Sequence, residues 1–418
     1  MPEWPRVILH ADLNSFYASV ECLYRPELRQ QPVAVSGDAE SRHGIILAKN
    51  EPAKRFGIKT GEAIWQAKQK CPGLIVVKAD YAKYLKYAQM TRRILADYSD
   101  QVEPFGLDEA WIDVTGTLPL IGSGTEVADL IRVRVREELG LTCSIGVSFN
   151  KIFAKLGSDM KKPDATTVLS PDNFRERVWP LPVSELLYVG MSTRRRLNRI
   201  GVRTIGMLAA MRLEDARSIL GKWGETLWFF AGGLDQSPVQ TSDARDVIQS
   251  VGNSTTTPRD LVTSDDVRLI ITVLADSVAA RLRSYGLKCS TVQISIRDNQ
   301  MMTIERQTKI RMPTDLSGAL VRHAMGLFEQ HWPWIKPIRS LGVRACDLVT
   351  ADGLVQLSLL DDQMYDQRQK DLEVTIDQIR HRYGYFSVQR GLMLSDRRLS
   401  GFNPREEHVI HPVAFPGL

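Results

Sequence analysis

Cysteine is scarce in this chain of 418 residues, and long apolar runs are missing. The five cysteines are dispersed without C-x-x-C spacing, which argues against a zinc site or a disulfide framework and indicates a reducing compartment. No segment reads as a membrane-spanning stretch, and no cationic start precedes an apolar one. The sequence therefore predicts a cytoplasmic protein that is neither exported nor embedded in a membrane.

An excess of one charge is also nearly lacking, since the net charge is only +5. That excess is unevenly placed, because residues 250–345 contain 13 Lys or Arg against 8 Asp or Glu. This distribution indicates a separate basic module. A hydrophobic content of 43% in a chain of this length is enough for several domains, each with its own core.

Two adjacent carboxylates, Asp108 and Glu109, lie where one extended segment ends and another begins. Neighbouring side chains of a regular strand point to opposite faces, so both can reach one cation only at a distorted hairpin tip. Gly106 provides the backbone freedom for such a tip. An Asp-Glu pair by itself is more often a solvated turn, so a second acidic element is needed for a functional interpretation.

That second element is Asp12, which ends the short apolar run at residues 7–11, a pattern typical of a buried strand. Mg²⁺ prefers hard oxygen ligands, so carboxylates converging from two strands, with the carbonyl of Leu13, could hold two ions for phosphoryl transfer. The alternative is that Asp12 caps the helix that begins near Ser15.

Four motifs resemble those of the Y-family translesion DNA polymerases, with the bacterial DNA polymerase IV (DinB) branch the most similar. They are DLNSFYASVE at 12–21, KNEPAKRFGI at 49–58, GLDEA at 106–110 and SIGVSFNKIFAKLGSDMKKP at 144–163. The motifs occur in the family's order and cover most of the first 165 residues.

The resemblance implies an α/β (α+β) multidomain fold shaped like a right hand. The expected parts are a palm at 1–20 and 80–170, small fingers at 21–79, a helical thumb at 171–240, a linker at 241–249, a little finger at 250–345 and a tail at 346–418. Within the fingers, the pattern itself predicts strands at 32–37 and 45–48 and a helix opening at Asn50.

The resemblance also assigns the catalytic site. Two Mg²⁺ ions would be held by Asp12, Leu13, Asp108 and Glu109, and the incoming deoxynucleotide would be bound by Phe16, Tyr17, Lys54 and Lys162. Tyr17 would exclude a 2′-hydroxyl, whereas Phe16 is expected in the core. Ile45 and Leu47 would lie above the nascent base pair, which predicts poorer tolerance of bulky template adducts than of small minor-groove ones. One departure from the family is Glu51, where a tyrosine is common; it must point away from the triphosphate or pair with a cation, and it also suits the first turn of a helix.

DNA contacts are expected in two places. Residues 187–202 resemble a helix-hairpin-helix in which Gly190 and Arg194 would meet a phosphate. Ser264, Asp265 and Asp266 predict the start of a helix that runs to about Ser284. Alternation of apolar and polar residues over 290–297 predicts a strand with one buried and one solvent-exposed face. On that sheet, Arg297, Arg306, Lys309 and Arg344 would contact phosphates without reading the base sequence.

In the tail, residues 356–360 are similar to the peptide by which bacterial polymerases bind the sliding clamp (beta subunit), with Leu360 in place of the usual aromatic. The members of this motif are Gln356, Leu357, Ser358, Leu359 and Leu360. A helix is expected near 372–383, and no function is assigned to the residues after it.

The function predicted from these features is template-directed addition of deoxynucleotides to a primer, with release of pyrophosphate. The resemblance implies low fidelity, low processivity, no proofreading exonuclease, a monomeric enzyme and a role in synthesis past damaged DNA. The alternatives are a UmuC-like polymerase that needs protein activators, a catalytically silent scaffold tethered to the clamp, and a palm-type nucleotide cyclase. The cyclase would leave the basic module unexplained, and the silent scaffold would require lost carboxylates.

Overall fold

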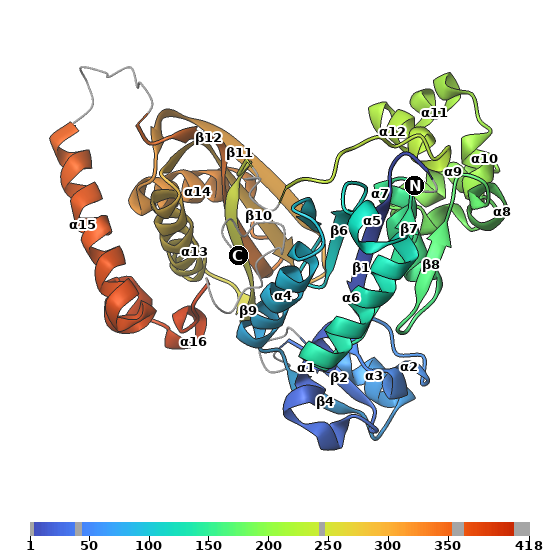
Figure 1. The fold of residues 1–418 in the computed structure, drawn as a ribbon. Helices are drawn as coiled ribbons and strands as arrows, with labels where there is room; N and C mark the ends of the chain where they lie inside the picture. The colour runs from blue at the N-terminus through green and yellow to red at the C-terminus, as the bar shows by residue number, and fades with distance from the viewer. Residues whose placement is uncertain (1–3, 38–43, 242–246, 353–362, 405–418) are drawn as a thin grey trace. The chain divides into compact units, whose positions relative to one another are not determined.

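The computed structural model describes residues 4–37, 44–241, 247–352 and 363–404, which form two compact units. The first unit contains residues 4–37 and 45–241, and the second contains 247–352 and 363–404. Figure 1 traces the chain through both. Helix and strand are mixed in each unit, which confirms the expected fold class.

A five-stranded sheet forms the centre of the first unit, in the spatial order β5-β6-β1-β7-β8. Its strands come from two separate pieces of the chain: β1 (Ile8–Leu13), β5 (Val102–Pro104), β6 (Glu109–Asp113), β7 (Cys143–Ser148) and β8 (Thr166–Leu169). The strand β1 is buried along its whole length and pairs antiparallel with both β6 and β7. The buried strand predicted at the N-terminus is therefore confirmed, and it includes Asp12.

Alternation along β1 divides its side chains between two layers of helix. Leu9, Ala11 and Leu13 belong to the core beneath helices α4 (Tyr81–Ala96) and α6 (Gly124–Leu139). His10 and Asp12 face the other way and contact helix α7 (Lys151–Met160). Because Gly146 of β7 has no side chain, the backbone of α7 can lie directly against the sheet.

The interpretation of Asp12 as a helix cap is wrong. Helix α1 (Phe16–Tyr24) begins after Ser15, which takes the N-cap position with a left-handed backbone and no side-chain cap. Asp12 is one of the strand residues of β1 and is 4% exposed. Its carboxylate therefore does not cap α1.

A smaller sheet, in the order β3-β2-β4, lies between α1 and α4 in the sequence. Its strands are β2 (Val33–Ser36), β3 (Ile46–Lys49) and β4 (Ile75–Lys78), and its helices are α2 (Glu51–Lys54) and α3 (Ile64–Lys70). The two strands predicted here are confirmed, and Asn50 caps α2 by accepting a hydrogen bond from the Ala53 amide at 3.1 Å.

The rest of the first unit is helical and packs around its own apolar cluster. Its α-helices are α8 (Phe174–Val178), α9 (Met191–Arg199), α10 (Ile205–Ala209), α11 (Leu213–Leu220) and α12 (Lys222–Ala231). This arrangement agrees with the compact helical pattern expected after residue 171. Short helix α5 (Leu118–Ile121) precedes α6.

The second unit is an antiparallel sheet with helices on one face, in the order β11-β10-β12-β9. Its elements are β9 (Val251–Leu261), α13 (Ser264–Ser284), β10 (Leu287–Asp298), β11 (Thr303–Thr314), α14 (Ser317–His331) and β12 (Ile338–Thr350). The helix predicted to run to Ser284 is confirmed. Its cap is one residue earlier than expected, since Thr263 accepts the hydrogen bond from the Asp266 amide.

The tail helix α15 (Gln363–Tyr383) is longer than predicted, and it packs against the rest of the second unit through charged side chains. Arg283 of α13 pairs with Glu373 at 2.5 Å and with Asp377 at 2.7 Å. Glu373 is nearly buried and also accepts hydrogen bonds from the amide and the hydroxyl of Ser317. Because a buried charge is costly unless it is paired, these contacts are what allow a polar helix to pack here. Among the described helices, none has both the length and the apolar content needed to cross a membrane.

Candidate functional site

The register of β1 and β6 brings together two of the predicted carboxylates. Asp12 and Glu109 are direct cross-strand partners, so their side chains lie on one face of the sheet. Asp108 lies just before β6, outside the regular strand, and its carbonyl accepts a hydrogen bond from the Leu13 amide at 2.9 Å. Gly106 has φ of 101°, as expected for the irregular tip.

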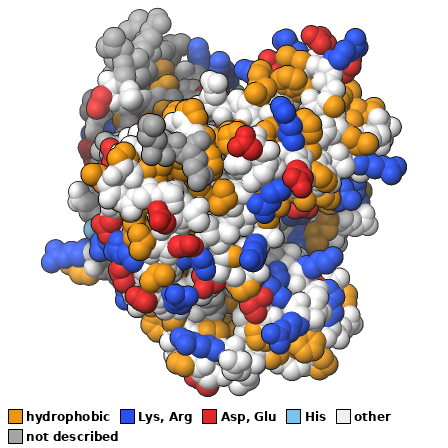
Figure 2. All heavy atoms as spheres, turned by 45° about the vertical axis from the view of Figure 1, so that its right-hand side comes forward, with side chains coloured by type: hydrophobic (Ala, Val, Ile, Leu, Met, Phe, Trp, Pro, Cys, Tyr) orange, Lys and Arg blue, Asp and Glu red, His pale blue; other side chains and the backbone are white. Residues whose placement is uncertain are grey.

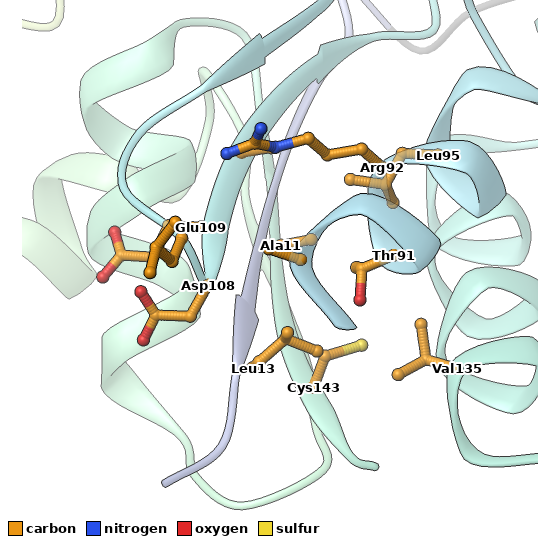
Figure 3. A pocket seen from close by; sticks show the side chains of 12 residues that line it. Ala11, Leu13, Thr91, Arg92, Leu95, Asp108, Glu109, Val135 and Cys143 are labelled. Atoms are coloured by element: carbon orange, nitrogen blue, oxygen red, sulfur yellow. The ribbon is translucent and has the colours of Figure 1, made fainter. Parts of the chain in front are cut away.

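The carboxylates of Asp108 and Glu109 point away from Thr91, Arg92 and Leu95 of α4 (Figure 3). A small cavity lies on the α4 side of the strands and is lined there by apolar side chains together with these three residues. Arg92 crosses this side to donate a hydrogen bond to the Gly106 carbonyl at 3.0 Å. Asp108 and Glu109 also line this cavity, although their carboxylates point away from α4. Arg92 holds the tip that precedes Asp108.

An ammonium group lies between the two paired carboxylates. Lys155 Nζ of α7 is 3.1 Å from Asp12 Oδ2 and 2.8 Å from Glu109 Oε2. Lys162 Nζ is 2.8 Å from the same Asp12 oxygen. Within the described ranges, no three His, Cys, Asp or Glu side chains are grouped closely enough to hold a metal ion as they stand.

Burial and mutual repulsion control the protonation of the acids. Burial, then the charge of Glu109, raises the pKa of Asp12, and burial with both neighbouring carboxylates raises the pKa of Asp108 to about 7. Burial would also raise the pKa of Glu109, but contacts with His10 and Lys155 outweigh it and lower that pKa to about 2. Burial opposes the charge of Lys155, whereas Asp12 and Glu109 raise its pKa, so this lysine stays protonated.

Three charged or polar residues close to these carboxylates and lysines were not singled out from the sequence: His10, Lys155 and Asp159. His10 is fully buried, with Nδ1 2.9 Å from Ser158 Oγ and Nε2 3.3 Å from Glu109 Oε2, the latter without hydrogen-bond geometry. Burial lowers its pKa. The sequence did contain a signal for these residues. His10 is two residues before Asp12, so on a strand the two side chains share a face, and Lys155, Asp159 and Lys162 have the spacing of one helix face.

Tyr17 and Phe16 differ in burial as expected. Phe16 is 3% exposed within the core, whereas Tyr17 is only partly buried and packs at the core's edge. The Tyr17 ring stacks on that of Tyr84, with centroids 4.3 Å apart and planes 16° from parallel, and it meets Tyr81 edge-on. The side chain of Phe16 is thus enclosed, and Tyr17 is the one that retains an exposed surface.

Glu51 and Lys54, at the start and end of α2, pair with each other at 2.5 Å. Of the two expected outcomes for Glu51, turning away from the triphosphate or pairing with a cation, the structure shows the pairing. Glu51 also lies in the first turn of a helix, as the other interpretation of this residue expected. Ile45 and Leu47 flank the buried Ile46, so they share the opposite, more exposed side of that strand.

The hairpin region places Gly190 at the N-cap of α9, with Arg194 exposed one turn later. In the second unit, the strand register separates the four basic residues. Arg297, Lys309 and Arg344 pair with Ser340, Thr291 and Gln293, on the face away from the helices. Arg306 pairs with the buried Ile294 and therefore lies on the helix-covered side, at the edge strand. Arg306 therefore does not share a face with the other three basic residues.

Charge alone does not identify a nucleic-acid surface on the face drawn in Figure 2, because Lys and Arg side chains are scattered there among acidic and apolar ones. The predicted clamp motif, residues 356–360, lies outside the described residues, as does most of the expected linker.

Comparison with known proteins agrees with the resemblance read from the motifs. Residues 11–159 match the impB/mucB/samB family, and residues 248–359 match the C-terminal domain of that family. DNA polymerase IV of Acetivibrio thermocellus is 53% identical, over 94% of this chain and 99% of that protein. DNA polymerase IV 1 of Bacillus subtilis is 36% identical, over 94% of each chain.

A Y-family DNA polymerase chimera of known structure shares the fold, with a TM-score of 0.73 at 20% sequence identity, over 82% of this chain and 99% of that one. The family matches cover both the region of the carboxylates and the basic module. With the sequence identity to the bacterial relatives, they establish that this chain belongs to the Y-family of DNA polymerases, in its DinB branch.

Proposed function

We propose that this chain is a template-directed DNA polymerase of low fidelity and low processivity that extends primers past damaged bases. The observation that carries the proposal is the pairing of Asp12 with Glu109 across β1 and β6, with Asp108 beside them and Lys162 on Asp12. This combination suits phosphoryl transfer, because catalysis of that reaction consists mainly of positioning the reactants and neutralising charge.

The donor set suits a divalent cation. Three carboxylates supply hard oxygens, and two of them already hold a cationic group, Lys155, between them. Asp12, Asp108 and Glu109, with the Leu13 carbonyl, would hold two Mg²⁺ ions. When bound, these ions would acidify the primer 3′-hydroxyl and neutralise the departing pyrophosphate.

The chain's own cations would bind the triphosphate. Lys162 is 30% exposed, and Lys54 is 35% exposed at the other sheet's helix α2. Each is now paired with an acid, so each must exchange a carboxylate for phosphate when the nucleotide enters. The exchange replaces one anion by another and therefore leaves neither lysine unpaired.

Primer extension on undamaged and lesion-bearing templates, with and without Mg²⁺, tests this function. We expect template-dependent addition on both templates and none without a divalent ion. No extension under any condition would instead favour the silent scaffold. Extension that appears only with added partner proteins would favour the UmuC-like alternative.

We expect the sheet face of the second unit to bind the DNA backbone. Replacing Arg297, Lys309 or Arg344 with alanine should weaken primer-template binding and reduce the slope of log affinity against log salt by about 1 for each phosphate that is no longer neutralised. Fluorescence anisotropy across a salt series measures both quantities. Arg306→Ala is the matched control, since this exposed arginine lies on the other side of the sheet; an equal loss in that variant would argue against the face assigned.

For the sliding clamp, we propose that residues 356–360 bind as a local unit. Replacing Leu357 and Leu359 with alanine should remove apolar burial of about 2 kcal/mol for each side chain, or more than tenfold in affinity apiece. Synthesis on a short primer without the clamp should barely change. With a loaded clamp, the unmodified enzyme should make longer products, because tethering raises its local concentration. If the variant with both leucines replaced gains as much product length from the clamp as the unmodified enzyme does, residues 356–360 are not the clamp-binding segment.

A further inference from the structure

Asp12 and Glu109 are held together by a lysine of their own chain. Lys155 Nζ is 2.8 Å from Glu109 Oε2 and 3.1 Å from Asp12 Oδ2, and its side chain is only 12% exposed. Two facing carboxylates would otherwise repel each other in a partly buried position. The ammonium therefore occupies the position where a cation best offsets both charges.

Lys155 has a second anionic partner that is not on the sheet. Asp159, one turn later on α7, lies 3.1 Å from Lys155 Nζ and 2.9 Å from Lys162 Nζ. Its side chain is 44% exposed, unlike that of Asp12 at 6%. The two lysines and the two aspartates thus form a closed ring of ion pairs, with one aspartate on the sheet and one at the surface.

We propose that Lys155 is a built-in counter-cation that competes with divalent metal for Asp12 and Glu109, and that Asp159 retains this lysine when metal takes its place. The inference rests on the metal site of the proposed function. It makes Lys155 and Asp159 positioning residues, which determine how tightly the carboxylates bind metal before DNA or nucleotide arrives.

The competition follows from shared carboxylates. A metal ion held by Asp12 and Glu109 would need the two groups that Lys155 contacts. A divalent charge within a few ångströms of an ammonium is strongly repelled in a partly buried site. Lys155 can withdraw without any movement of α7, because its flexible side chain already reaches Asp159, four residues along the same helix.

Mn²⁺ binding to the full chain, without DNA or nucleotide, tests the proposal by electron paramagnetic resonance of the free ion. Lys155→Met keeps the apolar stem and removes the competing charge, so the dissociation constant for Mn²⁺ should fall about tenfold, a change worth about 1.4 kcal/mol. Asp159→Asn should act in the opposite direction, weakening Mn²⁺ binding severalfold, because Lys155 then has only the sheet carboxylates. In the Lys155→Met background, Asp159→Asn should have little effect.

Lys151→Met is the matched control. Lys151 is on the same helix and equally buried, but it pairs with Glu103, with 2.6 Å to both carboxylate oxygens. The Lys151→Met variant should bind Mn²⁺ with the same affinity as the unmodified chain. Equal or weaker binding by Lys155→Met overturns the proposal. If that variant does not fold, the surface variant Asp159→Asn decides, and unchanged or tighter binding overturns it.

The metal site itself is tested separately with Asp12→Asn. If the unmodified chain and this variant bind Mn²⁺ equally, the metal site and the proposed function that depends on it are both overturned. If Asp12→Asn weakens binding while Lys155→Met does not tighten it, only the role of Lys155 is rejected.

Discussion

Asp108→Ala or Glu109→Ala should abolish nucleotide addition while leaving affinity for primer-template DNA nearly intact. Glu109 is the cross-strand partner of Asp12, and Asp108 holds the adjoining carboxylate, so either change removes a charge that a metal ion needs. Affinity should persist because most of it comes from phosphate contacts elsewhere. Single-turnover primer extension and anisotropy titration, performed on the same preparation, measure the two effects.

The expected loss is large. Removing one group that stabilises charge in a phosphoryl or acyl transition state typically costs 10²- to 10³-fold in rate, and a metal ligand should cost at least about as much. Asp113→Ala is the control, since Asp113 is an acid at the other end of the same strand and pairs with Arg6 at 3.4 Å. Near-normal turnover in Asp108→Ala would overturn its assignment to the site.

Tyr17→Ala should raise ribonucleotide incorporation by about 100-fold relative to deoxynucleotide incorporation. The ring is supported from beneath by Tyr84, which is fully buried and stacked at 4.3 Å, so it cannot easily yield to an added 2′-hydroxyl. Rejection of a single added hydroxyl by packing is typically worth about this factor. Deoxynucleotide turnover should fall only modestly, because Tyr17 is not among the residues proposed to hold the metal ions.

Tyr17→Phe is the matched control, since it keeps the ring and removes only the hydroxyl. Its sugar selectivity should equal that of the unmodified enzyme. The ratio of kcat/KM for the two sugars on one template measures the effect. If Tyr17→Ala discriminates as strongly as Tyr17→Phe does, Tyr17 is a packing residue and the steric role is rejected.

Local patterns were enough to predict many elements. The apolar run before Asp12, the helix to Ser284 and the cap at Asn50 depend on hydrophobic periodicity and on side chains a few residues away, and each is present. Arg306 shows a local signal that was missed. On a regular strand, residues three apart point to opposite faces, so Arg306 and Lys309 could not both lie on the solvent-exposed face of the sheet.

The sequence by itself determined which side chains are candidates to bind metal and nucleotide, and in which order along the chain, because residue type and spacing in four motifs resemble those of the family. Only the tertiary structure decided how they meet. The register that places Asp12 opposite Glu109 joins segments about a hundred residues apart, and the position of α7 against β7 inserts Lys155 between them. Likewise, the docking of α15 depends on Arg283 meeting Glu373 across 90 residues. Such contacts arise from packing over long chain separations, which no local pattern encodes.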